Sequence, residues 1–234
     1  KLLAKEEIIP DGVNKALFIF LPILGVTAAL ASALYTPMLG FAPAFSFRGD
    51  LILVVYMLSV LTICLGLAGA NTVDRFSLVG ATRTLTQLFS YEAPFMLTLL
   101  GPALAAGTLQ ISQINTYAQD TWWIILTQPI GFLVALIGLM GKLELPPFDA
   151  PEAETEIVSG ALTEYSGRGL ALFKLAKAVE LVVGLTLLSA FFLHGVAGPV
   201  DFLIKTLILL LVIAILQVVL TRFRIDQVVR WWRI

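Results

Sequence analysis

Six long runs of almost uninterrupted apolar residues are the feature that most constrains the fold of this 234-residue chain. A helix that crosses the roughly 30 Å hydrocarbon core of a bilayer needs about 20 apolar residues. Hydrophobic residues make up 59% of the sequence and charged residues only 13%, which excludes an ordinary soluble domain. We therefore predict an all-α, polytopic transmembrane helical bundle, with six spans at residues 16–39, 51–70, 93–109, 122–140, 170–193 and 202–220.

The spans follow one another without a repeat, a low-complexity tract or a separate soluble region. Residues 1–234 are therefore predicted to form a single transmembrane domain. Because the chain begins at Lys1 in mid-pattern and ends just as a new segment starts, we expect both ends to be truncated. The one cysteine, Cys64, lies in an apolar run, which excludes a disulfide framework and a cysteine-ligated metal or iron-sulfur site built from this chain alone.

The lysines and arginines are distributed very unevenly between alternate loops. Only Arg48 and Lys205 fall on one side of the predicted spans, and positively charged loops stay on the cytoplasmic side of a membrane. We therefore expect a multi-pass protein of the cell membrane with its charged loops facing the cytoplasm. Charges of both signs on that side indicate a docking surface for a soluble partner. The net charge of −1 does not indicate a nucleic-acid partner.

Residues 141–169 form the longest charged loop, and we predict that this acidic cytoplasmic loop is the functional centre. Asp149 is predicted to cap a short helix that would place Glu152 and Glu156 on one face and Glu154 on another. Partly buried carboxylates this close together share or pass a proton near neutral pH; a solvated acidic loop is the alternative. Basic residues flank the loop and would hold it at the membrane surface: Lys142, Arg168, Lys174 and Lys177.

Charged residues also lie within predicted spans. Lys174, Lys177 and Glu180 are three residues apart, and an ionisable group inside a membrane helix is costly enough that it usually faces protein or water. Glu180, the deepest, is predicted to serve a proton path or to pair with Lys177, whereas the lysines alone are explained by reaching to the interface. Glu92 opens the predicted third span, where it either carries protons or complements the helix dipole. The sequence has no phosphate loop, nucleophile elbow or metal-binding histidine pair, so a self-contained enzyme is not expected.

The stretch PFDAPEAETEIVSGALTEYSG, residues 147–167, resembles the cytoplasmic loop of one membrane subunit of respiratory complex I and related membrane-bound hydrogenases. That H/ND1-type subunit joins the electron-transferring arm to the proton-pumping arm. LVGATRTLTQLFSYE (residues 78–92) is similar to the family's other loop, KLLAKEEIIP to the segment after its first helix, and RFRIDQVVRWW to the approach to its last helix. The resemblance implies about eight tilted helices, of which this chain would lack the first and most of the last.

The resemblance also implies a function. Such a subunit binds no redox centre itself and couples reduction at the nearby acceptor site to charge movement through buried carboxylates. Its partners are cytoplasmic electron-transfer subunits with iron-sulfur clusters and, in a hydrogenase, a nickel-iron centre, together with antiporter-like and small membrane subunits. The predicted coupling residues are Glu92, Asp149, Glu152, Glu154, Glu156, Glu164, Lys177 and Glu180. The predicted partner-arm or charge-support residues are Glu6, Arg83, Lys142, Arg168, Arg222, Arg224 and Asp226.

Departures from the family pattern bear on the electron acceptor. Lys142 and Leu145 occupy positions where quinone-reducing members usually have a glutamate and an arginine, and Lys177 replaces the usual acid, with Glu180 one turn later. These changes favour a relative that takes electrons from ferredoxin and reduces protons or sulfur compounds. A quinone-site subunit and a structural anchor without a coupling role are the alternatives. A stand-alone transporter is disfavoured because no inverted repeat is visible.

Overall fold

The computed structural model describes residues 2–121 and 124–231, apart from the side chains of Leu3, Glu154, Thr155 and Trp231. Every regular element within these ranges is helical, which confirms the predicted all-α class. Short 3-10 helices lie at Leu2–Ala4, Met38–Gly40, Ala150–Glu152 and Gly160–Leu162. The α-helices are α1 (Lys15–Leu34), α2 (Asp50–Ala70), α3 (Arg75–Ala106), α4 (Ile111–Asp120), α5 (Ile124–Thr127), α6 (Pro129–Lys142), α7 (Glu154–Ile157), α8 (Gly167–Phe192), α9 (Pro199–Val219) and α10 (Ile225–Trp231).

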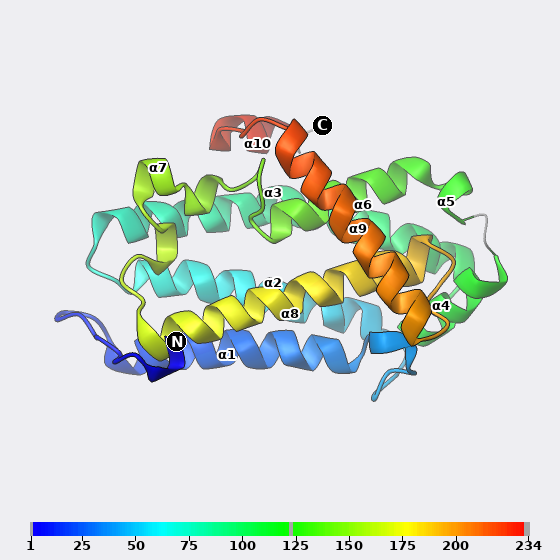
Figure 1. The fold of residues 1–234 in the computed structure, drawn as a ribbon, viewed down its shortest axis with the longest axis horizontal. Coiled ribbons are helices and arrows are strands. Elements are labelled where there is room, and N and C mark those ends of the chain that lie inside the picture. The colour runs from blue at the N-terminus through cyan, green and yellow to red at the C-terminus, as the bar shows by residue number, and fades with distance from the viewer. Residues whose placement is uncertain (1, 122–123, 232–234) are drawn as a thin grey trace.

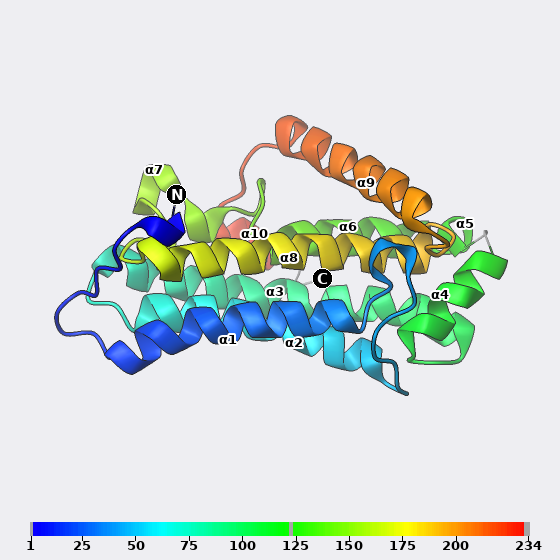
Figure 2. The ribbon, with the colours of Figure 1, turned by 60° about the horizontal axis from the view of Figure 1, so that its bottom comes forward.

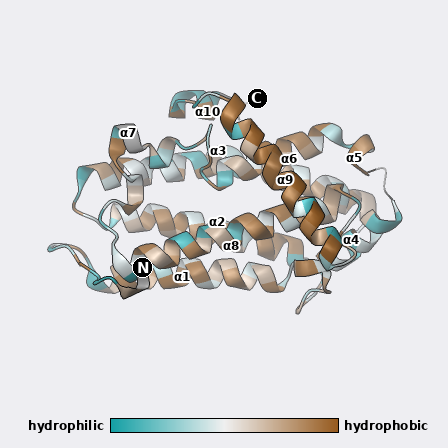
Figure 3. Cartoon of the chain, in the orientation of Figure 1, coloured by the Kyte–Doolittle hydropathy of each residue, from teal (hydrophilic) through white to brown (hydrophobic). Residues whose placement is uncertain are grey.

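Four long helices, α1, α2, α3 and α8, run side by side and form the body of the bundle (Figures 1 and 2). Helix α6 packs against α3, while α9 crosses α8 obliquely and stands away from the others. Helix α9 is coloured as hydrophobic along most of its length in Figure 3, yet only Phe202, Thr206, Leu209 and Ile213 are buried. An apolar helix that buries so little of its surface against protein is suited to contact lipid or another membrane subunit.

Five helices are long and apolar enough to cross a membrane, one fewer than the sequence predicted. The difference concerns residues 122–140, of which Trp122 and Trp123 lie outside the described ranges. Helix α5 ends at Thr127, and α6 begins at Pro129 and has 14 residues. Because Pro129 has no amide hydrogen to continue the preceding helix, the apolar run is divided, and α6 alone is too short to span the membrane.

Helix α3 corrects a second prediction. Residues 78–92 were expected to be a loop, with a span starting at residue 93, but α3 runs without interruption from Arg75 to Ala106. No proline or helix-ending turn occurs before Pro94, and polar residues alone do not end a helix. Glu92 therefore lies near the middle of a 32-residue helix and not at the start of one.

The loop at residues 141–169 folds back onto the bundle as three short helical pieces. A single helix containing both Glu152 and Glu156 was wrong, because Ala153 adopts φ −55° and ψ 87° and separates the turn at Ala150–Glu152 from α7. Asp149 takes the predicted cap position without a side-chain capping bond. The third piece, Gly160–Leu162, packs against α2 and α3. A Cβ atom at Gly80 would collide with the Ala161 nitrogen, so this close approach requires glycine.

Candidate functional site

The site is organised around the sharp end of α6. Lys142 is the last residue of this helix and is 2% exposed, and Glu144, two residues on, is 5% exposed. Glu144 has φ 53°, a left-handed conformation that is uncommon for a residue with a side chain. This turn directs the lysine and the glutamate toward different neighbouring helices. The positively charged Lys142 and the negatively charged Glu144 are thus both buried, although only one residue separates them in the sequence.

The first group of contacts joins α6 to α2 and α3. Lys142 Nζ lies 3.4 Å from the Glu92 carboxylate and 3.5 Å from the Ser59 hydroxyl oxygen. The Ser59 hydroxyl in turn donates to the other Glu92 oxygen. Lys142 Nζ is also 5.5 Å from the centre of the Tyr91 ring, within the range of a cation-π interaction. Lys142 was predicted to hold carboxylates at the membrane surface; instead its side chain is fully buried against the middle of α3.

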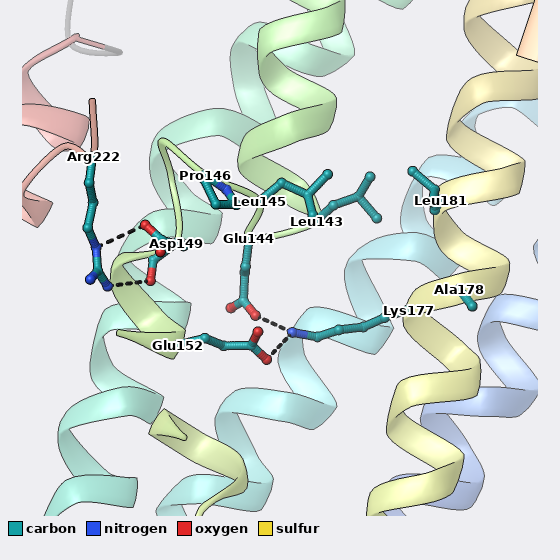
Figure 4. Close-up of a pocket in the computed structure, with 10 residues that line it drawn as sticks. All are labelled: Leu143, Glu144, Leu145, Pro146, Asp149, Glu152, Lys177, Ala178, Leu181 and Arg222. Atoms are coloured by element: carbon teal, nitrogen blue, oxygen red, sulfur yellow. Dashed lines mark hydrogen bonds and ion pairs between the residues drawn. The ribbon is translucent and has the colours of Figure 1, made fainter. Parts of the chain in front are cut away.

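The second group joins the turn to α8. Lys177 Nζ contacts the carboxylates of Glu144 at 2.5 Å and Glu152 at 2.6 Å (Figure 4). Lys177 therefore pairs with two loop residues and not with Glu180, which corrects one of the predicted alternatives. A lysine held between two carboxylates has a choice of partner, so a change in one pair alters the other.

Glu180 follows Lys177 by one helical turn and is 1% exposed. Its Oε1 atom is buried and has no hydrogen-bond partner among the described residues. The charges of Lys142, Lys177, Glu144 and Glu92 all act on this carboxyl group, although none of them forms an ion pair with it within the described part of the chain. Buried carboxyl groups of this kind in membrane helices are costly, and they are retained for function more often than for stability.

Lys177, Glu144 and Glu152 together form what we call the Lys177 cluster. A cavity of about 570 Å³ opens beside this cluster (Figure 4). Its polar side includes Asp149, which is paired with Arg222 at 2.9 Å. Its apolar side includes Leu145 and Leu181, and the full set of lining residues is Leu143, Glu144, Leu145, Pro146, Asp149, Glu152, Lys177, Ala178, Leu181 and Arg222. A cavity with one apolar wall and a few convergent charges suits a small, partly polar molecule.

The outer contacts tie the loop to α3. Arg83 donates to the Glu156 carboxylate at 2.6 Å and to the Ala150 carbonyl at 3.2 Å. The hydrogen bond and charge of Arg83 lower the pKa of Glu156 below its ordinary value. Because half of the Glu156 side chain is exposed, this pair is a surface ion pair and contributes little to stability.

The remaining predicted residues whose side chains are described take no part in the ion pairs of Lys142 and Lys177. Glu6, Arg168 and Lys174 are exposed, and the described structure records no ion pair for them. Arg224 and Asp226 are exposed and line a second cavity of about 460 Å³ next to Arg83. Glu164 is half-buried, and its Oε2 atom has no partner among the described residues. The Glu154 side chain lies outside the described part of the structure.

Sequence reasoning missed three members of the site. Glu144 lies within the predicted acidic loop but was given no role, although it forms one of the shortest ion pairs. Ser59 and Tyr91 were not singled out, because a lone serine or tyrosine in an apolar helix is ordinary. The spacing of Ser59 within α2 carries no signal by itself; only the packing of α2 against α3 brings it to Glu92.

Chemically, the site is a set of alternating acids and bases that extends from the loop into the middle of the bundle. Its members can exchange protons or shift ion pairs when the charge at one position changes. Within the described residues no group of three or more histidine, cysteine, aspartate or glutamate side chains has an arrangement that would hold a metal ion.

The comparisons with known proteins agree with the loop motifs. The family model described as NADH dehydrogenase matches residues 1–234. The NADH-quinone oxidoreductase H subunit of Carboxydothermus hydrogenoformans is 34% identical over 244 residues, covering 100% of this chain and 69% of the relative. The proteins of the same name from Bacillus thuringiensis and Bacillus anthracis are each 34% identical over 247 residues, covering 100% of this chain and 73% of the relative. The chain thus belongs to the NADH dehydrogenase family, among the H/ND1-type membrane subunits of respiratory complex I.

Proposed function

We propose that this chain couples electron transfer in a docked peripheral arm to the translocation of protons or other ions. The observation that carries the proposal is a charged cluster inside the bundle, in which Lys142, Glu144 and Glu180 are buried and their neighbours Glu92 and Lys177 are partly exposed. Glu92 and Glu180 lie near the middle of α3 and α8, at a depth where a structural anchor for a soluble partner has no need of charge. Burial of so many ionisable groups is expensive in a membrane, so a role in charge movement explains their presence.

In the proposed mechanism, a redox event in the peripheral arm changes the charge in or beside the cavity. The Lys177 cluster responds first, because it lines the cavity and its lysine is shared by Glu144 and Glu152. Loss or gain of one partner there changes the electrostatic field at Glu180 and, through the α6 turn, at the Lys142–Glu92 pair. Protons then pass to neighbouring antiporter-like subunits. Interactions between charges in a low-dielectric interior are strong enough for one added charge to change its neighbours' protonation.

For the electron acceptor, the names of the relatives favour quinone over the ferredoxin-linked hydrogenase or sulfur reductase that the sequence departures suggested. The cavity is compatible with a quinone head group, since Lys177 and Arg222 supply hydrogen-bond donors and Leu143, Leu145 and Leu181 supply an apolar wall. The hydrogenase-type reading is retained as the second candidate, because Lys142 is committed to Glu92 and Leu145 replaces a basic residue at the cavity.

The remaining parts of the proposal concern the surroundings of the chain. The loop of residues 141–169 and the nearby Arg224 and Asp226 face the cytoplasm and contact the electron-transfer subunits. Those subunits carry the iron-sulfur clusters and, in the hydrogenase-type reading, a nickel-iron centre. Helix α9 and the other apolar faces contact lipid and small membrane subunits.

The test uses the intact complex reconstituted into sealed vesicles. Glu180→Gln and Glu92→Gln each remove one charge from the cluster with little change in shape, and each should lower the number of ions moved per electron. Asp120→Asn is the control, because that carboxylate is exposed at the end of α4, outside the charged cluster, and belongs to neither set of predicted functional residues. A purely structural anchor predicts less assembled complex but an unchanged ratio in whatever assembles. A normal ratio in both the Glu180 and the Glu92 variant would contradict the coupling function.

A quinone-site inhibitor separates the two candidate acceptors. If quinone occupies the cavity, Leu181→Trp should weaken inhibition and raise the quinone concentration needed for half-maximal turnover. Val182→Trp is the neighbouring control, because Val182 is exposed and does not line the cavity. Insensitivity of the complex to quinone-site inhibitors, together with reduction of protons or sulfur by ferredoxin, would favour the hydrogenase-type reading.

A further inference from the structure

Gln87 lies on α3 between the two ends of the turn that follows α6, and its side chain is buried. Its Nε2 atom donates to the carbonyl of Gly141 at 2.7 Å and to the carbonyl of Phe148 at 2.8 Å. An amide nitrogen has two hydrogens, so both are used. A flipped amide would place its oxygen against two carbonyl oxygens, and this repulsion fixes the orientation of the group.

The two carbonyls enclose the segment that carries both buried charges of the turn. Between them lie Lys142, whose partner Glu92 is on α3, and Glu144, whose partner Lys177 is on α8. The Gln87 amide therefore holds the start and the end of this segment against the same helix. If the segment shifted along α3, both hydrogen bonds would break together, and the distances of both ion pairs would change.

The other end of the Gln87 amide distinguishes it from an ordinary structural clamp. Its Oε1 atom is buried and has no partner among the described residues. Asn115, at the opposite end of the bundle, uses both ends of its amide: Nδ2 donates to the Val196 carbonyl at 3.2 Å, and Oδ1 accepts from the Val196 amide at 2.7 Å. A buried amide that leaves its oxygen unsatisfied gives up stability that Asn115 retains. This difference points to a requirement on Gln87 other than stability.

We infer that Gln87 is a positioning residue, which keeps Lys142 and Glu144 aligned so that a charge change at Lys177 reaches Glu92. The inference rests on the proposed coupling function. In this inference, the Gln87 amide holds the turn that carries Lys142 and Glu144 in place, while the charged side chains themselves carry the protons. A purely structural role for Gln87 would affect folding and assembly but not the coupling of assembled complexes.

Two substitutions of similar length test the inference in the intact complex. Gln87→Met can donate no hydrogen bond, whereas Gln87→Glu can donate at most one. Asn115→Leu is the control, because it removes a buried amide clamp of comparable structural importance away from the charged cluster. The measurements are ions translocated per electron in sealed vesicles and hydrogen exchange of the amides at Leu145 and Phe148.

We expect Gln87→Met to lower the ratio of ions to electrons at least about twofold, as for other residues that tune coupling without contacting a ligand. Hydrogen exchange in the turn should accelerate roughly tenfold, since two hydrogen bonds of ordinary strength are lost. Gln87→Glu should show a smaller change in both measurements, and Asn115→Leu should leave both unchanged in assembled complexes.

Three results would overturn the inference. The first is an unchanged ratio in Gln87→Met while Glu92→Gln lowers it, which would leave the proposed function intact. The second is an equal loss of coupling in Asn115→Leu, which would show a general effect of loosened packing. The third is failure of both Gln87 variants to assemble, which would assign the residue to folding. A normal ratio in Glu92→Gln and Glu180→Gln, in contrast, would contradict the proposed function itself.

Discussion

Two regions of this molecule bury polar side chains, and they do so in different ways. At the end of the bundle near α4, Asp50 is fully buried and accepts hydrogen bonds from the Ile111 amide at 2.7 Å and the Ser46 hydroxyl at 3.2 Å. Asn115 likewise bonds to backbone there. Around the α6 turn, by contrast, Lys142 and Lys177 are paired with carboxylates on other elements.

The nature of the partners explains the different uses of the two regions. The hydrogen bond that the Ile111 amide donates to Asp50 fixes the start of α4, and a backbone amide is a partner that cannot titrate. An ionic partner can lose or gain a proton, and Lys177 has two carboxylates to choose between. Burial of charge is therefore compatible with either a rigid cap or a responsive network, and the partner decides which.

The largest effect is expected from Lys142→Met. Removing one partner of a fully buried pair costs about 3–5 kcal/mol, and this is the upper limit here, because Glu92 is partly exposed and keeps its hydrogen bond from Ser59. The protein should unfold at a lower temperature or fail to assemble, as measured by thermal unfolding in detergent and by the yield of intact complex. Adding Glu92→Gln to Lys142→Met should recover part of the stability. If the double variant is no better than the single one, Lys142 does not depend on its pairing with Glu92.

Gly80→Ala should cause the next largest loss of stability, because it pushes the loop of residues 141–169 away from α3. The new Cβ would collide with the Ala161 nitrogen and lie 2.5 Å from the Gly160 carbonyl carbon, both of which are backbone atoms that cannot rotate away. Overpacking of this kind costs about 1–3 kcal/mol. Limited proteolysis should cut the loop faster. Gly131→Ala is the control, since its nearest contacts would be 3.7 Å away.

Asp50→Asn tests the cap region and should have a smaller effect. The asparagine oxygen can still accept from Ile111, but it loses the charge that strengthens the bond, so we expect a loss of about 1 kcal/mol. Thermal unfolding should show this loss, while the ratio of ions to electrons should stay at the wild-type value. A lowered ratio would mean that Asp50 also takes part in charge movement, and the contrast between the two regions would fail.

The smallest effect concerns the exposed pair of Arg83 and Glu156. The lowered pKa of Glu156 means that the pair stabilises the folded protein above the ordinary glutamate value of 4.5. This contribution is lost as the pH falls from that value through the lowered pKa of the folded state. Thermal unfolding from pH 7 to pH 3 should therefore show a slightly steeper loss of stability in the wild type than in Glu156→Gln. Identical pH profiles would contradict the assigned pairing.

Much of the fold was predictable because its signals are local. Apolar runs of sufficient length predicted the helices, and the loop motifs indicated the family that the comparisons then confirmed. The errors were also local: Pro129 divides one apolar run, and the polar first half of α3 was interpreted as a loop. The roles assigned to individual carboxylates stay predictions until coupling is measured.

The sequence by itself determined the helical membrane class, the family and the concentration of charge between residues 141 and 180. Only the tertiary structure decided which charges are paired. The turn after α6 directs Lys142 toward α3 and Glu144 toward α8. The loop places Glu152 next to Lys177, so that Lys177 pairs with Glu152 and Glu144 and not with Glu180. Sequence spacing reports which residues share one helix face, whereas these pairs join different elements and depend on how the helices pack.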